Sequence, residues 1–489
     1  MATHTPETKM AAVNVPDDRV EFAMKEGLDD DAALQFTPAQ EKKIVRKVDL
    51  RLAVTLGALY CISLLDRTNL GSASIAGMQT GLGMNAKNNA YTIVSLVFFI
   101  SYTLFQVPAV VLIRTVGPRN FLTFIVLAWG AVMIGFGFVP SWEVMCVLRI
   151  ILGALEAGFY PGCVYLLSTW YPRFDLQKRN ALFYLIGSMA GGFGGILAYG
   201  LMQMDGLAGL SGWRWIFIIE GIVTCLLAFV AYFIIVDFPE DSPKSWHFLN
   251  EAEAAWVVAR IEKDRSDTLP DKFSVGKYLR NALDSKVWAF AWLTMLTTTN
   301  SYAIAYFLPI ILLDGMGFSI AEAQCLVAPP YVMAAIVMFV QAYFADKWRM
   351  RGVVVAGNAL LGILGLALLG YVHTPGVRYF GVFLATTAAN ANCPALLTYQ
   401  GNNIRGQWKR ALASATLVGG ASIGGIIGTT VFRAKDAPNY RPGILTCMLA
   451  NVLIVIIVIA LSLKFHRANK RVDNGGKPIE GLQGFKYTL

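Results

Sequence analysis

Four ionisable side chains interrupt long apolar stretches of this sequence. Asp66 and Arg67 follow a charge-free run, and small and apolar residues resume directly after them in "LGSASIAGM". Arg149 and Glu156 stand in a second apolar stretch, "RIILGALEAG". A charged side chain inside a bilayer is costly and usually faces a cavity or a partner. These four residues are therefore the first candidates for the functional site of the protein.

The spacing within each pair fixes how the side chains are directed on a helix. Arg149 and Glu156 are seven residues apart, so they point the same way and lie about 10 Å apart along the axis. Asp66 and Arg67 are adjacent, and their directions diverge by about 100°. Because the two stretches run in opposite senses, Asp66 and Arg149 reach a similar depth. We therefore expect a contact between Asp66 and Arg149 that leaves Arg67 free for a ligand.

These residue types fit the co-transport of an organic anion with protons. A guanidinium offers a fork of donors that matches a carboxylate. A carboxylate buried away from water can be loaded with protons near neutral pH. The sequence predicts that Asp66 and Glu156 couple protons, that Arg67 binds substrate and that Arg149 is the charge partner. A role of Arg149 in helix packing remains the alternative.

The elements that hold these residues are predicted to be membrane spans. Hydrophobic residues make up 56% of the 489 positions and charged residues 15%, whereas soluble domains carry about 25% charged residues. A spanning helix needs roughly 20 mostly apolar residues. Twelve stretches meet this requirement, and they are residues 52–75, 89–113, 120–139, 143–168, 180–203, 214–236, 287–313, 321–344, 353–372, 377–399, 409–432 and 440–464.

One long polar stretch divides the twelve spans into six and six, and it contains a short amphipathic pattern, "NEAEAAWVVARIEKDR". With both termini placed in the cytosol, 33 of the 41 Lys and Arg fall in tails and cytoplasmic loops, as the positive-inside rule requires. We expect a cytoplasmic tail, a six-helix bundle, a cytoplasmic linker, a second six-helix bundle and a second cytoplasmic tail, at residues 1–50, 51–236, 237–286, 287–465 and 466–489.

This layout predicts an all-α membrane protein of the major facilitator fold, in which two six-helix halves rock around a midplane site. Each half of that fold is expected to carry a charged turn between its second and third helices. The second half has one, with Asp346, Lys347 and Arg349 as its gating motif, whereas "RTVGPRN" in the first half departs from the pattern. Glycine-rich runs at 187–195 and 419–428 occupy corresponding spans and indicate close-packing faces.

Four sequence strings resemble the anion:cation symporter family of the major facilitator superfamily. They are "LDRTNLG", "LRIILGALEAGFYPG", "STWYPRFDLQKR" and "GWRWIFIIEG". Over about residues 40–470, the chain is similar to the fungal allantoate permease branch, which includes nicotinate, pantothenate, biotin and ureidosuccinate permeases. The resemblance implies proton-carrying roles for Asp66 and Glu156. It also implies that Arg67 contacts substrate and that Arg149 pairs with an acid.

The same resemblance implies further site residues on the second span. Tyr102, followed one turn on by Gln106 in a "Y-x-x-x-Q-[IV]-P" context, is expected to line the site. Some relatives also carry a Tyr two residues before the Asp, where this chain has Leu64. Glu220, in the string that opens the sixth span, is interpreted as structural.

The second six spans carry only neutral polar side chains in mid-span. Asn300 and Asn390 are predicted to bind substrate through hydrogen bonds, and Tyr302, Tyr306 and Asn392 are further candidates. For each of them, a satisfied contact between helices is the favoured interpretation and a contact with substrate the other. The first half is thus expected to carry the charged groups of the site, and the second half to offer neutral hydrogen-bonding groups.

Enzymatic activity is not expected. The sequence has no nucleophile–base set, metal-ligand spacing or phosphate loop, so no catalytic residue, metal site or cofactor is predicted apart from the proton gradient. The four histidines lie in tails or loops, at His4, His247, His373 and His466. The expected partners are a small organic anion, protons and the lipid bilayer, with no nucleic acid. A monomer in the plasma membrane is the expected state.

The predicted function is proton-coupled symport of a small organic anion, a carboxylate such as a vitamin or ureide acid. The alternative is a major-facilitator exporter or uniporter of a secondary metabolite, a drug or a neutral solute. A drug:proton antiporter would need a Pro among the fifth-span glycines, which is absent. "PEDSPKSW" after span six suggests a sugar uniporter, but a neutral sugar does not require Arg67 beside Asp66.

Overall fold

Helices make up the whole fold in the part of the chain that the computed structural model describes. The described residues are 36–85, 88–244, 248–266, 282–348, 350–404, 407–437, 439–476, 478–479 and 485–488. Every regular element among them is a helix. This confirms the predicted all-α fold class.

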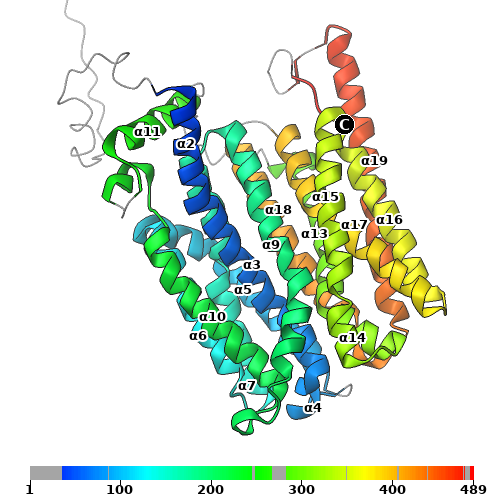
Figure 1. Cartoon of the computed structure of the whole chain (residues 1–489). Coiled ribbons are helices and arrows are strands. Elements are labelled where there is room, and N and C mark those ends of the chain that lie inside the picture. Colours follow the sequence, from blue (N-terminus) through cyan, green and yellow to red (C-terminus); the bar gives the residue numbers. More distant parts are fainter. Residues whose placement is uncertain are drawn as a thin grey trace, which may run out of the picture.

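The first half of the chain begins with a short amphipathic helix, α2, and continues into a bundle of longer helices (Figure 1). The side chain of Thr37 caps α2 by accepting a hydrogen bond from the Gln40 N–H. The elements of this half are α2 Pro38–Val48, η2 Asp49–Val54, α3 Thr55–Ala73, η3 Ser74–Met78, α4 Gln79–Gly81, α5 Ala90–Val116, α6 Pro118–Phe136, α7 Trp142–Glu156, α8 Phe159–Trp170, α9 Arg173–Met202, η4 Leu207–Gly209 and α10 Gly212–Ile234.

The second half follows a linker that contains η5 Pro239–Lys244 and α11 Glu251–Ser266. Helix α11 covers the predicted amphipathic stretch and is tied to the first half by an ion pair between Lys47 and Glu253, 2.9 Å from N to O. The elements after the linker are α13 Ser285–Ile310, η6 Ile311–Gly315, α14 Ile320–Cys325, α15 Ala328–Trp348, α16 Arg351–Tyr371, α17 Pro375–Asn403, α18 Gln407–Val431, η7 Ala434–Asp436 and α19 Arg441–Asp473.

The helices are long and apolar enough to make this a multi-pass membrane protein. Among the described residues, 11 helical segments meet the length and hydropathy expected of a span. Helix α5 contains a shorter apolar segment, Ala90–Gln106, within a helix of 27 residues. Together they account for the twelve predicted spans.

The fourth span is broken beside one of its charged residues. Helix α7 ends at Glu156 and α8 begins at Phe159, so the span is two helices rather than one. Pro161 explains the break, because it has no N–H to donate to the carbonyl of Ala157 and its ring clashes with that carbonyl. Glu156 is thus the last residue of α7, and the two residues that follow keep helical dihedral angles up to the start of α8.

Both described ends of the chain lie at the same end of the molecule. We call this the tail end, marked by α2 and the last turns of α19, and the opposite end, marked by α4 and α14, the far end (Figure 1). The two halves touch toward the far end, where the Gln324 side-chain amide donates to the carbonyl of Ser72 (3.0 Å) and the Tyr91 hydroxyl to that of Tyr306 (3.0 Å). At Gly195 a Cβ would collide with the Gln324 carbonyl, so glycine permits this contact.

Candidate functional site

A cavity of about 190 Å³ lies between the two halves, about half-way along the helices. Helices α3, α5, α8 and α9 line it from the first half, and α13, α15, α17 and α18 from the second. Arg67 is the only charged side chain among the described residues that line it. Aromatic rings cover much of the wall, and they belong to Tyr60, Phe99, Tyr102, Tyr160, Tyr184, Tyr302 and Tyr331. The cavity therefore presents one positive charge within a largely aromatic wall.

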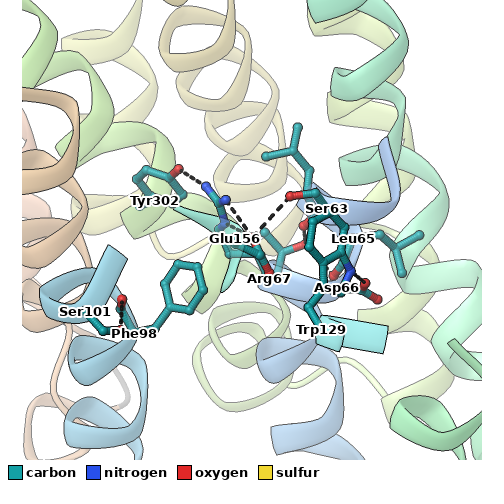
Figure 2. A network of polar contacts seen from close by, with 11 residues as sticks. Ser63, Leu65, Asp66, Arg67, Phe98, Ser101, Trp129, Glu156 and Tyr302 are labelled. Atoms are coloured by element: carbon teal, nitrogen blue, oxygen red, sulfur yellow. Dashed lines mark hydrogen bonds and ion pairs between the residues drawn. The ribbon is translucent and has the colours of Figure 1, made fainter. Parts of the chain in front are cut away.

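The guanidinium of Arg67 joins the two halves of the molecule (Figure 2). Its Nη2 lies 2.7 Å from Glu156 Oε2, and its Nε donates to the same oxygen at 3.2 Å. Its Nη1 donates to the Tyr302 hydroxyl of the second half at 2.9 Å. The rings of Phe98 and Tyr102 lie 5.1 and 4.9 Å from the guanidinium carbon. Arg67 therefore has an anionic partner, a neutral partner and two aromatic faces.

Asp66 turns away from the cavity into the first half (Figure 2). Its Oδ2 accepts hydrogen bonds from Trp129 Nε1 at 3.2 Å and from the Thr224 hydroxyl at 3.1 Å. Its Oδ1 is buried and has no hydrogen-bond partner among the described residues. The divergence of Asp66 from Arg67 is the arrangement expected of adjacent residues on a helix.

The expected contact between Asp66 and Arg149 is wrong for this conformation. Arg149 is fully buried, none of its three guanidinium nitrogens has a hydrogen-bond partner among the described residues, and its guanidinium lies over the Phe136 ring. Asp66 is instead satisfied by neutral donors on α6 and α10. The sequence supplied the depths of the two side chains but not the direction in which each one turns.

The expectation that Arg67 is free for a ligand is also wrong here, because Glu156 holds it. Ser63 and Arg67 are one turn apart on the same face of α3, and both donate to Glu156 Oε2, Ser63 at 3.1 Å. The other carboxylate oxygen, Oε1, is buried without a hydrogen-bond partner among the described residues.

The neutral site candidates fall into two groups. Tyr102 and Asn390 line the cavity, and the Asn390 amide donates to the carbonyl of Thr386. Gln106 and Asn300 are buried and do not belong to the cavity wall. Asn300 accepts a hydrogen bond from Asn451 on α19 at 3.2 Å, and its contact with substrate stays a prediction.

Three residues that contact the charged groups were not predicted. Ser63 had a readable signal, because it lies four residues before Arg67 and shares its helical face. Thr224 and Trp129 come from α10 and α6, and only the packing of α10 against α3 and of α6 against α10 brings them to Asp66. Tyr302, a secondary candidate in the sequence, is a direct partner of Arg67.

The predicted gating motif lies at the end of α15. Asp346 and Lys347 belong to its last turn, and Lys347 is exposed. Arg349 lies outside the described residues.

The sequence profile of the Major Facilitator Superfamily matches residues 56–429, which cover all but the last of the predicted spans. The chain belongs to the Major Facilitator Superfamily. This major facilitator protein is therefore a transporter and not an enzyme. No group of His, Cys, Asp and Glu in the described part of the chain is arranged to hold a metal ion.

Relatives of this major facilitator protein are fungal transporters. The "MFS-type transporter cnsO" of Penicillium expansum is 32% identical over 465 residues, covering 93% of this chain and 88% of the relative. The "High-affinity nicotinic acid transporter" of Saccharomyces cerevisiae is 28% identical over 458 residues, covering 92% and 84%. Both alignments span nearly the whole transporter.

Solved structures agree with the fold. A bacterial homologue of the human lysosomal transporter Spinster, in an inward-facing and occupied conformation, matches with a TM-score of 0.62 at 15% identity. The match covers 84% of this chain and 95% of that one. At this level of identity the likeness concerns the fold alone.

Proposed function

We propose that this protein is a proton-coupled symporter of a small organic anion, a carboxylate such as a vitamin or ureide acid. The observation that carries the proposal is that Arg67, the charged side chain of the cavity wall, is held by the buried carboxylate of Glu156. A substrate carboxylate and Glu156 are two anions that compete for one guanidinium.

Because this ion pair is buried, binding of the substrate anion and binding of a proton depend on each other. Both side chains are almost inaccessible to solvent, 6% for Arg67 and 0% for Glu156. Removing one partner of a buried pair leaves an uncompensated charge, which costs about 3–5 kcal/mol. A substrate anion that took Arg67 would leave Glu156 charged and unpaired, unless Glu156 had taken up a proton. A proton that arrived without the anion would leave Arg67 unpaired. The two therefore bind best together, and a carrier with this property is a symporter.

The aromatic wall favours a substrate with a flat or unsaturated body. A planar carboxylate can place its charge on Arg67 while its body packs against tyrosine rings such as Tyr60 and Tyr102. The relative named as a nicotinic acid transporter supports a vitamin acid as one substrate of this kind. The sequence strings that resemble the anion:cation symporters and the allantoate permease branch support the same class.

The arrangement in the membrane is also part of the proposal. We place both termini and the linker in the cytosol, with six-helix bundles at residues 51–236 and 287–465, in a monomer at the plasma membrane. The distribution of Lys and Arg supports this orientation. The tail end is then the cytoplasmic end, and the far end faces outward.

Uptake into proteoliposomes tests the proposal. The purified protein is reconstituted, a pH gradient is imposed, and accumulation is measured for a panel of labelled small carboxylates that includes nicotinate. Nicotinamide, which has the same ring without the charge, is the matched neutral solute. We expect accumulation of at least one carboxylate, its collapse with a protonophore, and no accumulation of nicotinamide.

The Arg67→Ala variant decides the role of the arginine. Loss of the guanidinium removes the partner of the substrate carboxylate, so accumulation should fall by about 100-fold or more, the equivalent of about 3 kcal/mol. The matched control is Arg433→Ala, which removes a half-exposed cation of the second half. Undiminished uptake by Arg67→Ala, or equal uptake of nicotinamide and nicotinate, would refute the proposed function.

A further inference from the structure

A third buried carboxyl belongs to the same charged cluster. We propose that Glu220 of α10 is a proton-carrying residue of the transporter, which holds a proton in this conformation and exchanges it with Asp66. The inference rests on the proposed proton-coupled function and adds a residue to it. It differs from the structural role that the sequence suggested for Glu220.

Glu220 lies one helical turn from Thr224, the α10 residue whose hydroxyl contacts Asp66. Glu220 and Thr224 are one turn apart on α10, and the Thr224 Oγ1 lies 2.8 Å from the Glu220 carbonyl oxygen. The same Oγ1 lies 3.1 Å from Asp66 Oδ2. Counted from Gly212, where α10 begins at the far end, Glu220 is about 12 Å along the helix and Thr224 about 18 Å. Glu220 is therefore nearer to the far end than Thr224, the residue that contacts Asp66.

The side chain of Glu220 has no compensating partner. It is 4% exposed, and neither of its carboxylate oxygens has a hydrogen-bond partner in the described part of the chain. An ionised carboxylate in such a place pays its full desolvation penalty, which amounts to several kcal/mol. Buried groups of this kind take up a proton rather than carry the charge. A carboxyl kept only for packing would be expected to have its oxygens satisfied.

The helices packed around α10 bring one charged group to Glu220. These neighbours are α3, α6, α9 and η3. Helix α3 contributes Asp66, which acts on Glu220 electrostatically. Helix α6 contributes Trp129 and Gly130, and at Gly130 its backbone lies so close to α10 that a Cβ would meet Cys225. The charged residues described on α6 and α9 lie at the tail end, and η3 contributes none.

The buried charged cluster is electrically neutral only if one of its acids carries a proton. Among the described residues of the first half, the buried charged side chains are two arginines and three acids, namely Arg67, Arg149, Asp66, Glu156 and Glu220. One proton on an acid makes the cluster neutral. A second proton gives it a charge of one, which a substrate monoanion balances. Glu220 is the natural holder of the first proton, because it is the acid without a hydrogen-bond donor.

The proposed exchange is a simple proton transfer. The O–H bond of Glu220 breaks, an O–H bond forms on Asp66, and the negative charge moves from Asp66 to Glu220. Asp66 Oδ1, which lacks a partner in the described part of the chain, is the oxygen that can accept. Glu220 is then reloaded from the far end when that end opens.

Infrared difference spectroscopy tests the titration of Glu220 without any substrate. Spectra of the reconstituted protein at high and low pH are compared for wild type, Glu220→Gln and Glu143→Gln. Glu143 is the matched control because it is an exposed acid at the start of α7. We expect a carboxylic-acid C=O band that is present in wild type and in Glu143→Gln and absent in Glu220→Gln. Unchanged acid bands in Glu220→Gln would overturn the inference.

Transport assays separate the proton role from a structural one. With labelled nicotinate as probe, uptake driven by a pH gradient should fall by about tenfold or more in Glu220→Gln. Nicotinate exchange, which moves no net proton, should fall much less. Glu220→Asp keeps a titratable group and should restore driven uptake with a displaced pH profile, whereas a structural role would reduce both assays equally.

The infrared and transport experiments together distinguish a failure of the Glu220 inference from a failure of the proposed symport. If Glu220→Gln retains the wild-type pH profile while Asp66→Asn loses it, the inference about Glu220 is wrong and symport stands. If wild-type protein takes up no carboxylate, symport is wrong, and the infrared spectra still decide whether Glu220 titrates.

Discussion

The buried asparagine network of the second half and the buried charged cluster of the first half differ in how far their side chains are satisfied. In the second half, the amide of Asn358 donates to Gln341 at 2.9 Å and to Asn392 at 3.0 Å, and Asn451 donates to Asn300 at 3.2 Å. These side chains are neutral and satisfy one another. In the first half the buried cluster is charged, and five of its atoms or groups have no partner among the described residues: Asp66 Oδ1, Glu156 Oε1, both carboxylate oxygens of Glu220 and the whole guanidinium of Arg149.

The difference indicates which half changes its partners during transport. A satisfied network of neutral amides holds its helices in one arrangement. In a cluster with free acceptors and an unpaired guanidinium, other hydrogen-bond and ion-pair partners are available nearby. Binding of a proton or an anion can therefore change which groups pair. We infer that the second half is the scaffold and the first half the proton-responsive part. Four predictions test this contrast, in order of expected effect.

The largest effect is expected for Glu156→Gln. The substitution removes the anion that holds Arg67, so substrate no longer competes with a carboxylate and no proton is required for its binding. Uptake should lose its dependence on pH, and accumulation against a gradient should fall by about 100-fold. Exchange across proteoliposomes, measured at several pH values, separates binding from coupling. A variant that still accumulates substrate in a pH-dependent way would show that Glu156 is not the coupling residue.

A smaller effect on transport is expected at Tyr302, the second-half residue that contacts the charged Arg67. Tyr302→Phe removes the hydroxyl that accepts from Arg67 at 2.9 Å. A hydrogen bond to a charged group is worth about 1.5–3 kcal/mol, so KM for the transported carboxylate should change by about tenfold. Tyr306→Phe is the control, because its hydroxyl has no partner in the described part of the chain. Equal effects of the two variants would argue against a role for the Arg67–Tyr302 contact.

In the asparagine network of the second half, we expect a substitution to lower stability without changing KM or the pH profile of uptake. Asn358→Ala leaves the amides of Gln341 and Asn392 without a partner, which costs about 1–3 kcal/mol. The midpoint of thermal unfolding in detergent should fall, while KM and the pH profile of uptake stay at wild-type values. A changed pH profile would mean that the two halves are not separate in the way we infer.

The smallest effect concerns Asp284, outside the spans at the tail end of α13. Burial alone would raise the pKa of Asp284, but its hydrogen bonds with Lys409 and the Lys286 N–H, with the charges of both lysines, lower the pKa below its ordinary 3.8. Stability from this depressed pKa is present above the unfolded value and is lost as pH falls through the folded value.

Because Asp284 is partly exposed, we expect a contribution below about 1 kcal/mol. Asp284→Asn should lower the thermal midpoint slightly at pH 7, and the difference should shrink as the pH falls below the unfolded pKa toward the depressed folded pKa. A midpoint difference that persisted unchanged at acidic pH would show that the ion pair is not its source.

Particular residues show how far sequence reasoning reached. Adjacency on a helix was enough to predict that Asp66 and Arg67 face different ways, and the structure agrees. Depth along two helices suggested Asp66 and Arg149 as partners, but the actual ion pair joins Arg67 to Glu156. Asn300 and Asn390 looked alike in the sequence, and only Asn390 lines the cavity. Spacing constrains one helix at a time, whereas a contact depends on the rotation of two helices about their axes.

Hydropathy was sufficient to predict the membrane-spanning helices and four of the five charged side chains that are buried in the described part of the first half. These properties follow from the mismatch between charge and a low-dielectric membrane, which acts on each segment separately. The pairing of those charges was decided only when the segments packed. The packing of the helices brought Glu156 of α7 to Arg67 of α3, and the close approach of α6 and α10 gave Asp66 its neutral donors. A partner is a property of two surfaces together, so no single stretch of sequence contains it.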